Sequence, residues 1–244
     1  MSEKLERHRE TWEKKKIIRV IYGDWYRQIL RDLKSTTKKT LELGAGSGNF
    51  KEFKPDVTAS DIDFSSWLDI CFDAHYIPFK PNSVGNIVMI DVLHHLADPV
   101  RFFEDAWRVL ERGGRIVLVE PFPTLFSLYI YKRYHPEPFI MDEDYFEKHE
   151  VDVGAGKDPW EANQAAAYLL FFKHRALFLR YFKDKFGIIK QKRMSCLLYP
   201  ASGGFENRAM IPDFLIPLFK FKEIVLTPFR RFLAFRCYVV LEKN

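Results

Sequence analysis

The first half of the chain alternates short apolar runs with polar turns, as expected for buried strands that end at one edge of a sheet. Before the last of these strands, the apolar residues follow helical spacing. Asp98-Pro99 supplies an N-cap and a first helical residue, and Gly113-Gly114 marks the helix end. Strands are predicted at 39–43, 57–60, 68–72, 86–90 and 115–120, and a helix at 98–111. This alternation predicts an α/β fold with a doubly wound, mostly parallel sheet.

Helical spacing also appears before this core, where residues 3–34 place apolar side chains among charged ones. One or two helices are therefore expected, which either cap a ligand cleft or pack on the sheet. The chain changes character after Glu120, because 16 of its 23 phenylalanines lie there. We expect a helical, substrate-facing insertion over 121–186. The last predicted elements are an antiparallel edge pair of strands at 187–198 and 233–241, and a short apolar helix at 212–221.

Length and composition indicate a single domain, since 244 residues with 47% hydrophobic content can bury a full core. Its expected parts are N-terminal helices (1–35), a ligand-binding core (36–120), the insertion (121–186) and the last strands with their helix (187–244). No uncharged apolar run is long enough to cross a bilayer, and residues 1–13 are charged rather than signal-like, so we expect a cytoplasmic protein. The three cysteines are widely separated, so neither a disulfide framework nor a metal site is predicted. A net charge of +5 is too small to indicate a nucleic-acid partner.

The segment 41–49 is the most informative stretch, because an apolar strand containing Glu42 leads into glycines at 44, 46 and 48. Glycines at this spacing allow a sharp turn and leave backbone amides bare for contact with a ligand. A dinucleotide-binding loop has glycine or alanine three residues after its second glycine, where this chain has Asn49. The loop therefore disfavours a nucleotide-dependent oxidoreductase or epimerase. A glycine-rich turn without a ligand remains an alternative.

Acidic residues follow the other predicted strands. Asp61 ends the second strand, Asp73-Ala74 follows the third, and Asp91 precedes Val92-Leu93-His94-His95 after the fourth. The carboxyl ends of parallel strands meet at one edge of a sheet, so these acids and Gly44 are expected to line one cleft.

These blocks, with Gly113-Gly114-Arg115 before the fifth strand, resemble the class I S-adenosylmethionine (SAM) methyltransferases. Their order is similar to that of the ubiquinone and menaquinone methylase-like family, and 158–165 and 202–204 resemble a subfamily in which such blocks recur in the substrate half. The resemblance implies a Rossmann-like sheet of seven strands with an antiparallel edge strand, and SAM as the cofactor. By resemblance, Gly44 and Gly46 line the methionine and ribose portion with Glu42 beneath them, and Asp61 binds the ribose hydroxyls. Asp73 and Ala74 contact the adenine, and Asp91 with Leu93 borders the methionine end. Ala45, Ile62 and Val92 are expected to bind the cofactor beside them.

The chain departs from the family between Asp61 and Asp73, where the usual helix is missing. We therefore expect the floor and wall of the adenine pocket to come from nearby residues such as Ile62, Phe64 or Trp67. The first helix, before Pro55, is also too short to be a normal one.

His94 and His95 are the candidate catalytic residues, because they follow the fourth strand at the mouth of the cleft. A general base there would serve a hydroxyl or acidic-carbon acceptor. A helix-start hydrogen bond and packing are the alternative explanation of the pair. Further polar residues either face the substrate or belong to the solvated surface: Glu120, His135, Glu137, Asp142, Glu143, Asn163 and Gln164.

Two aromatic and basic stretches, 171–193 and 219–236, either pack in the core or lie against a membrane or an acyl-bearing acceptor. We favour core packing over membrane contact for both.

The sequence thus predicts a SAM-dependent methyltransferase that acts, without a metal ion, on an oxygen or carbon atom of a small-molecule or glycan-type acceptor. A non-catalytic SAM-binding module or partner subunit is the alternative. The sequence identifies neither the acceptor nor the oligomeric state.

Overall fold

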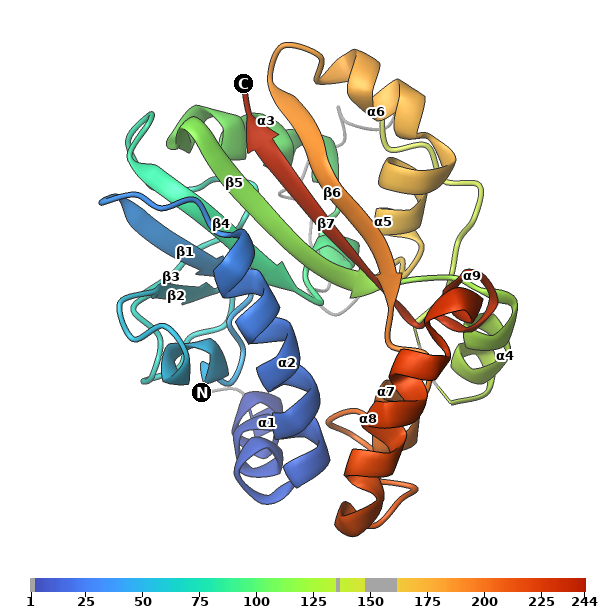
Figure 1. The fold of residues 1–244 in the computed structure, drawn as a ribbon. Coiled ribbons are helices and arrows are strands. Elements are labelled where there is room, and N and C mark those ends of the chain that lie inside the picture. Colours follow the sequence, from blue (N-terminus) through green and yellow to red (C-terminus); the bar gives the residue numbers. More distant parts are fainter. Residues whose placement is uncertain (1–2, 135–136, 148–161) are drawn as a thin grey trace.

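The computed structural model describes residues 3–134, 137–147 and 162–244. A seven-stranded sheet of order β3-β2-β1-β4-β5-β7-β6 runs through the molecule (Figure 1). Its strands are β1 (Lys39–Leu43), β2 (Thr58–Asp61), β3 (Ile70–Cys71), β4 (Val84–Ile90), β5 (Leu110–Pro121), β6 (Phe186–Met194) and β7 (Arg236–Lys243). Pairing is parallel from β3 to β5, and β7 is antiparallel to both β5 and β6. The predicted mostly parallel sheet is confirmed, and its antiparallel strand lies next to the edge strand β6.

Helices cover both faces of the sheet (Figure 1). They are α1 (Glu3–Lys14), α2 (Lys16–Asp32), α3 (Pro99–Val109), α4 (Leu125–Tyr134), α5 (Ala166–Tyr168), α6 (Arg175–Tyr181), α7 (Leu198–Ser202), α8 (Ile216–Val225) and α9 (Arg230–Leu233). A π-helical turn (Leu169–Lys173) joins α5 to α6, and short 3₁₀ turns occur at Asn49–Glu52, Leu93–His95, Asp213–Leu215 and Thr227–Phe229.

Alternate residues of the central strands point into two separate cores, as the pleat requires. Met89 and Leu118 pack with α3, α5 and α6 on one face. Val88 and Val117 pack with α2 and α7 on the other. The N-terminal helix α2 is therefore part of the sheet's packing, because its apolar stripe from Ile17 to Ile29 is buried there.

Several predicted boundaries are wrong. Helix α3 begins at Pro99, with the Asp98 side chain accepting a hydrogen bond from the Arg101 N–H (2.9 Å), but it ends at Val109 rather than 111. Leu110 already pairs with Val84, so β5 starts before the two glycines. Strand β6 stops at Met194 rather than 198, because α7 follows. The predicted helix 212–221 lies at Ile216–Val225, after a 3₁₀ turn.

The absence of a helix between Asp61 and Asp73 is confirmed, since 62–72 contains only turns and β3. The carboxyl ends of β1, β2, β4 and β5 meet at one edge of the sheet, where the chain enters β7 at Arg236. Among the described residues, no helix is both long enough and apolar enough to span a bilayer.

Candidate functional site

The glycine loop after β1 is left-handed at all three glycines, with φ of +62° at Gly44, +51° at Gly46 and +74° at Gly48. A Cβ on Gly44 would come within 2.2 Å of Val92 Cγ2, so the loop presses directly on the segment after β4. A Cβ on Gly46 would meet only Leu5 Cδ2, at 3.9 Å. Ala45 is fixed by its N–H, which donates to the Ser60 carbonyl oxygen (2.9 Å). At Gly44 both the close approach of Val92 and the positive φ favour glycine. At Gly46 only the positive φ does.

Asp61 at the end of β2 holds this loop. Its Oδ2 accepts from the Gly46 N–H (2.8 Å) and its Oδ1 from the Asp63 N–H (3.2 Å). Burial raises the pKa of Asp61 even though these backbone N–H groups act to lower it. Next to it, Ile62 and Phe64 are 48% and 68% exposed. The structure therefore brings together Gly46, a carboxylate and exposed apolar side chains.

Trp67, from the same segment, lies against the loop instead. Its indole Nε1 donates to the Gly46 carbonyl oxygen (2.9 Å), and its ring is what a Cβ on Gly48 would strike, at 2.9 Å.

Glu42 lies in β1 with its side chain buried. Burial and the nearby charge of Asp61 raise the pKa of Glu42 to about 8, so the carboxyl is protonated at neutral pH. Its Oε2 has no hydrogen-bond partner among the described residues. A buried carboxyl oxygen without a partner is costly and fits a ligand that brings a cationic donor.

Asp73 is half-buried and tied to a histidine that the sequence analysis did not single out. Its Oδ1 accepts from the backbone N–H (2.9 Å) and the ring Nδ1 (2.6 Å) of His75, and these bonds lower the pKa of Asp73. The His75 Nε2 in turn accepts from the Asp98 N–H (3.2 Å), which requires the proton on Nδ1. Ala74 packs against the core.

Asp91 follows β4 with φ of +59°, a left-handed conformation that is uncommon for a residue other than glycine. Its carboxylate forms an ion pair with Arg236 and accepts from the Tyr22 hydroxyl (3.3 Å). Burial raises the pKa of Asp91, opposed by the Arg236 charge. Arg236 also lies over the Tyr199 ring, 4.2 Å from its centroid. Asp91 is thus held by side chains from α2 and β7.

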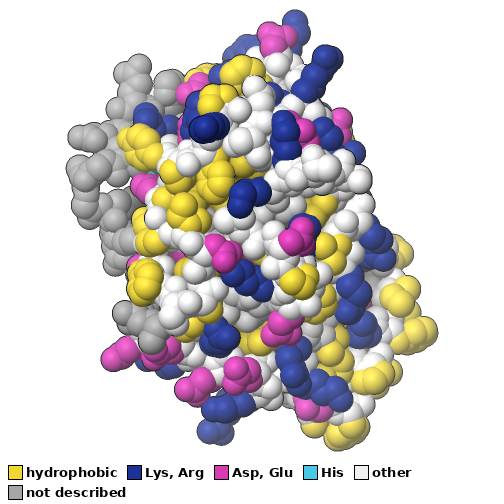
Figure 2. Space-filling model, turned by 90° about the vertical axis from the view of Figure 1, so that its left-hand side faces the viewer, with side chains coloured by type: hydrophobic (Ala, Val, Ile, Leu, Met, Phe, Trp, Pro, Cys, Tyr) yellow, Lys and Arg dark blue, Asp and Glu magenta, His cyan; other side chains and the backbone are white. Residues whose placement is uncertain are grey.

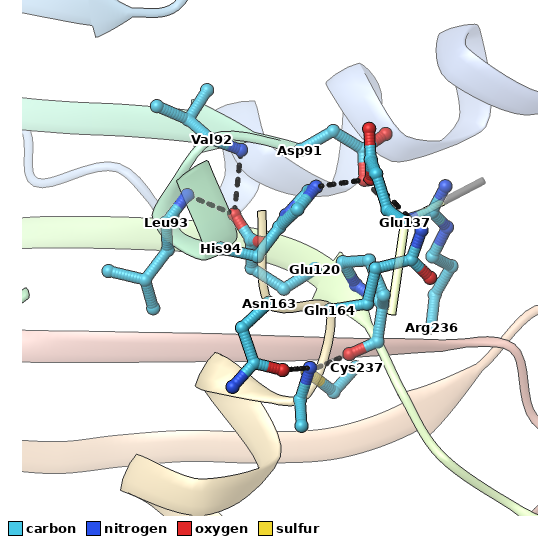
Figure 3. A network of polar contacts seen from close by, with 12 residues as sticks. Asp91, Val92, Leu93, His94, Glu120, Glu137, Asn163, Gln164, Arg236 and Cys237 are labelled. Carbon is cyan, nitrogen blue, oxygen red and sulfur yellow. Dashed lines mark hydrogen bonds and ion pairs between the residues drawn. The ribbon is translucent and has the colours of Figure 1, made fainter. Parts of the chain in front are cut away.

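Glu120 and His94 form the centre of a buried polar network (Figure 3). Glu120 is fully buried at the end of β5, and its Oε1 accepts from the N–H groups of Val92 (2.9 Å) and Leu93 (2.8 Å). Its Oε2 lies 2.6 Å from His94 Nδ1. Burial acts to raise the pKa of Glu120, but the charge of His94 and these hydrogen bonds outweigh it and hold that pKa below its ordinary value.

His94 lies between two carboxylates, since its Nε2 is 3.7 Å from Glu137 Oε2. Burial acts to lower the pKa of His94, but Glu120 and Glu137 outweigh it and raise it to about 9. Burial opposes ionisation of Glu137 as well, yet the contact with His94 lowers the pKa of Glu137 to about 2. At neutral pH the arrangement is therefore a protonated imidazole between two carboxylates.

His95 is partly exposed and behaves in the opposite way. Burial and the positive charge of His94, whose ring centroid is 4.3 Å away, lower the pKa of His95 to about 4, so it is neutral at pH 7. His94, His95 and Glu137 offer ligand atoms that all lie within 4.8 Å of one another, a spacing that a divalent metal ion would also accept. A proton on His94 already provides positive charge beside Glu137, and beside Glu120 on the other side of the ring.

Asn163 and Gln164 hold the segment that carries Glu137. Asn163 exchanges hydrogen bonds with the backbone of Ile140 (2.9 and 3.0 Å) and donates to Glu143 Oε2 (2.7 Å), and its own N–H donates to the His94 carbonyl oxygen (2.9 Å). The Gln164 Nε2 donates to Glu137 Oε2 (3.0 Å). A hydrogen-bonding role for both side chains is confirmed.

Asp142, another insertion residue named from the sequence, is exposed. His135 and residues 158–161 lie outside the described residues.

The structure places the predicted cofactor-binding residues, His94 and His95 at the edge where the parallel strands end, although Asp73 is engaged by His75. Sequence reasoning missed Tyr22, His75 and Arg236. Arg236 had one signal, as a charged residue at the start of the strongly apolar strand β7. Tyr22 and His75 had none, because their partners lie on other elements.

Comparison with known proteins gives a domain match and a fold match. Residues 41–118 match a family profile described as a methyltransferase domain. No curated protein matches the chain.

Solved structures with a similar fold include a putative sarcosine dimethylglycine methyltransferase from Galdieria sulphuraria (14% identity, 92% of this chain and 85% of that one, TM-score 0.51). A SAM-dependent methyltransferase from Archaeoglobus fulgidus is similar as well (16% identity, 93% of this chain and 94% of that one, TM-score 0.50). A geranyl diphosphate C-methyltransferase from Streptomyces coelicolor A3(2), solved with Mg²⁺, geranyl diphosphate and S-adenosyl-L-homocysteine, is also similar (13% identity, 96% of this chain and 84% of that one, TM-score 0.51). At these identities the structures show a shared fold. The domain match identifies residues 41–118 as a methyltransferase domain, and together with the shared fold it supports a SAM-dependent methyltransferase with SAM as its cofactor.

Proposed function

We propose that the protein transfers the methyl group of SAM to an oxygen or carbon atom of a small-molecule or glycan-type acceptor, at the edge where β1, β2, β4 and β5 end. The observation that carries the proposal is the buried carboxyl of Glu42, just before the glycine loop, whose Oε2 has no hydrogen-bond partner within the part of the chain that the structure describes. The ammonium group of SAM supplies the positive charge that this carboxyl lacks. When bound, SAM provides a methyl group on a positively charged sulfur, and an acceptor atom takes it by in-line displacement.

The residues around Glu42 suit the rest of this cofactor. Asp61 already orders the loop through Gly46 and has further lone pairs for ribose hydroxyls, with Ile62 beside it. Asp73 and Ala74 are assigned to the adenine, because the carboxylate of Asp73 is half-exposed and kept ionised by His75. The remaining assigned residues are Gly44, Ala45, Asp91 and Val92, whose backbone borders the methionine end.

The surroundings of His94 and His95 suggest a different role for each histidine. His94 is buried and protonated, so we assign it a positioning role: it holds Glu120 and Glu137 and keeps a positive charge beside the acceptor. His95 is neutral and partly exposed, so it is the candidate general base. For a hydroxyl acceptor, a ring nitrogen of His95 takes the hydroxyl proton while the acceptor oxygen bonds the methyl carbon.

Much of the expected rate enhancement comes from positioning. Holding acceptor and methyl group in line is worth roughly 7–11 kcal/mol in well-oriented systems. Asn163 and Gln164 contribute by fixing the segment of Glu137 over His94.

The test combines binding and transfer. Isothermal titration should show SAM binding to the wild type and weaker binding to Glu42→Gln and Asp61→Asn. Incubation with SAM labelled in its methyl group and a fractionated small-molecule extract should label an extract component. His95→Gln should lower that transfer by roughly 10²-fold or more without changing the Kd of SAM. SAM binding with no transfer to any fraction would favour the non-catalytic SAM-binding module, and absent SAM binding would refute the proposal.

A further inference from the structure

A large apolar surface near the end of the chain is left uncovered by the residues that the structure describes. We call it the apolar face, and it consists of Met210, Phe214, Leu218, Phe221, Ile224, Val225, Phe229 and Phe232, which are 45% to 78% exposed. These residues lie on α8 and on the short segments before and after it, and Ile216 is the one residue of α8 that is buried. A helix that is apolar on nearly all sides is normally enclosed by protein or lipid.

The size of the apolar face argues against chance exposure. A phenylalanine side chain presents roughly 200 Å² when uncovered, so eight large side chains at about half exposure expose several hundred square ångströms together. Patches of that size on a monomer mark sites of interaction. A groove of about 280 Å³ lies within the face, lined by Leu218, Phe221, Lys222, Val225 and Leu226.

The expectation that both aromatic stretches pack in the core is right for one of them only. Phe171, Phe178, Phe182 and Phe186 are buried beside α3. The stretch 219–236 instead supplies five exposed residues of the apolar face, from Phe221 to Phe232.

Neighbouring elements extend this surface. Helix α4 packs beside α9 and exposes Leu125 and Tyr129 (79% and 71%) (Figure 1). Basic residues border it, namely Arg208, Lys222 and Arg231 on the apolar segment and Lys132 and Arg133 at the end of α4.

The acidic Glu223 does not offset this charge at the surface. Its carboxylate accepts the backbone N–H groups of Cys196, Leu197 and Leu198 and is therefore directed into the protein. Asp213 is exposed on the same segment, so the surface combines apolar side chains with a rim in which basic residues outnumber acidic ones. By contrast, Lys and Arg mix with Asp and Glu on the face shown in Figure 2.

The apolar face borders the candidate site. Helix α4 begins four residues after β5 ends at Pro121, and α9 leads directly into Arg236, which pairs with Asp91. Whatever binds the apolar face is therefore held beside the edge of the sheet where methyl transfer is proposed.

From this we propose that the apolar face docks on a membrane surface containing anionic lipids, and that the acceptor is an amphiphile whose polar head group reaches the site from that surface. The docking half stands on exposure and charge. The acceptor half rests on the proposed function. Apolar side chains with a basic rim are the combination that a lipid surface with negative head groups recognises.

Vesicle co-sedimentation tests the docking half without cofactor or acceptor. The full-length protein should bind phosphatidylcholine vesicles that contain phosphatidylglycerol, and should bind pure phosphatidylcholine at least tenfold more weakly. The double variant Phe221→Ser/Ile224→Ser should bind the mixed vesicles at least tenfold more weakly. Lys222→Glu/Arg231→Glu should lose the preference for phosphatidylglycerol. Ile189→Ser is the matched control, because Ile189 is 49% exposed on β6, outside the apolar face, and binding should be unchanged.

The variants must also keep the Kd of SAM, which shows that they fold. Absence of vesicle binding, or equal binding by Phe221→Ser/Ile224→Ser, overturns the proposal. So does a dimer in sedimentation velocity that dissociates in that variant, because the face is then an interface between copies. The acceptor half predicts that mixed vesicles carrying lipid extract accept labelled methyl groups more than the aqueous extract does. Transfer confined to the aqueous extract would overturn that half and leave the proposed function intact.

Discussion

Proton release on cofactor binding is the sharpest consequence of the buried Glu42. Its pKa of about 8 means that the carboxyl is about 90% protonated in the free protein at pH 7. The ammonium group of SAM favours the ionised form, so binding should release about 0.9 proton per site at pH 7 and almost none above pH 9.

Isothermal titration at pH 7 in buffers of different ionisation enthalpy measures this release as the slope of the observed enthalpy. Glu42→Gln cannot release the proton, so its slope should be flat, and its Kd should rise about 10- to 100-fold, as expected when a charged hydrogen bond is lost. Glu10→Gln changes an exposed residue on α1 and should behave as the wild type. A wild-type enthalpy that does not depend on the buffer would refute the assignment of Glu42 to the ammonium group.

The same pKa has a consequence for stability without cofactor. A folded-state pKa of about 8 against 4.5 unfolded means that the folded protein binds the extra proton between those values. Stability from this group is fully present below pH 4.5 and is lost as pH rises to about 8, by on the order of 5 kcal/mol. Glu42→Gln should therefore unfold at a higher temperature than the wild type at pH 9, with little difference near pH 4.5.

Three further outcomes follow from the site. In calorimetry, Gly44→Ala should lower the unfolding temperature by several degrees, because the added Cβ meets Val92 Cγ2 at 2.2 Å. Gly204→Ala is the control and should lower it less, because Gly204 has a similar φ and nothing within 4 Å of the added Cβ. Val92→Ala should partly restore the unfolding temperature of Gly44→Ala. His94→Gln should destabilise by about 3–5 kcal/mol in denaturant titrations, because Glu120 is left buried without its cation. That loss should be full below pH 6.5 and vanish as pH rises through 9, where wild-type His94 loses its proton; an equal loss at pH 10 would contradict the ion pair. Dialysis against EDTA should leave methyl transfer unchanged, since a proton on His94 satisfies the carboxylates, and loss of transfer that Zn²⁺ restores would instead assign His94, His95 and Glu137 to a metal ion.

The local features of the site could be predicted from the sequence, and the long-range ones could not. Strand positions and the glycine loop follow from the period of apolar residues and from glycine spacing, both properties of neighbouring residues. The partner of Asp91 is 145 positions away, and Arg236 reaches it only because β7 pairs with β5. The end of α3 was misplaced because the pairing of Val84 with Leu110 outweighs the helix-ending preference of the two glycines.

Composition misled in one place for a similar reason. The phenylalanines of 171–186 and of 214–232 look alike in the sequence, yet the first group finds α3 to pack against and the second does not. Whether an apolar segment is buried depends on whether another element lies where it can pack against it. The local sequence pattern does not give that information.

The position of β7 has a consequence for how the molecule assembles during synthesis. Strand β7 (Arg236–Lys243) lies between β5 and β6 in the sheet, although both of them precede it in the chain. Until β7 is synthesised, β5 lacks its antiparallel partner strand, and Asp91 lacks its ion pair with Arg236. Completion of the sheet and formation of the Asp91–Arg236 ion pair are therefore one late event, and the polypeptide without β7 is the form that is most open to aggregation and to chaperones.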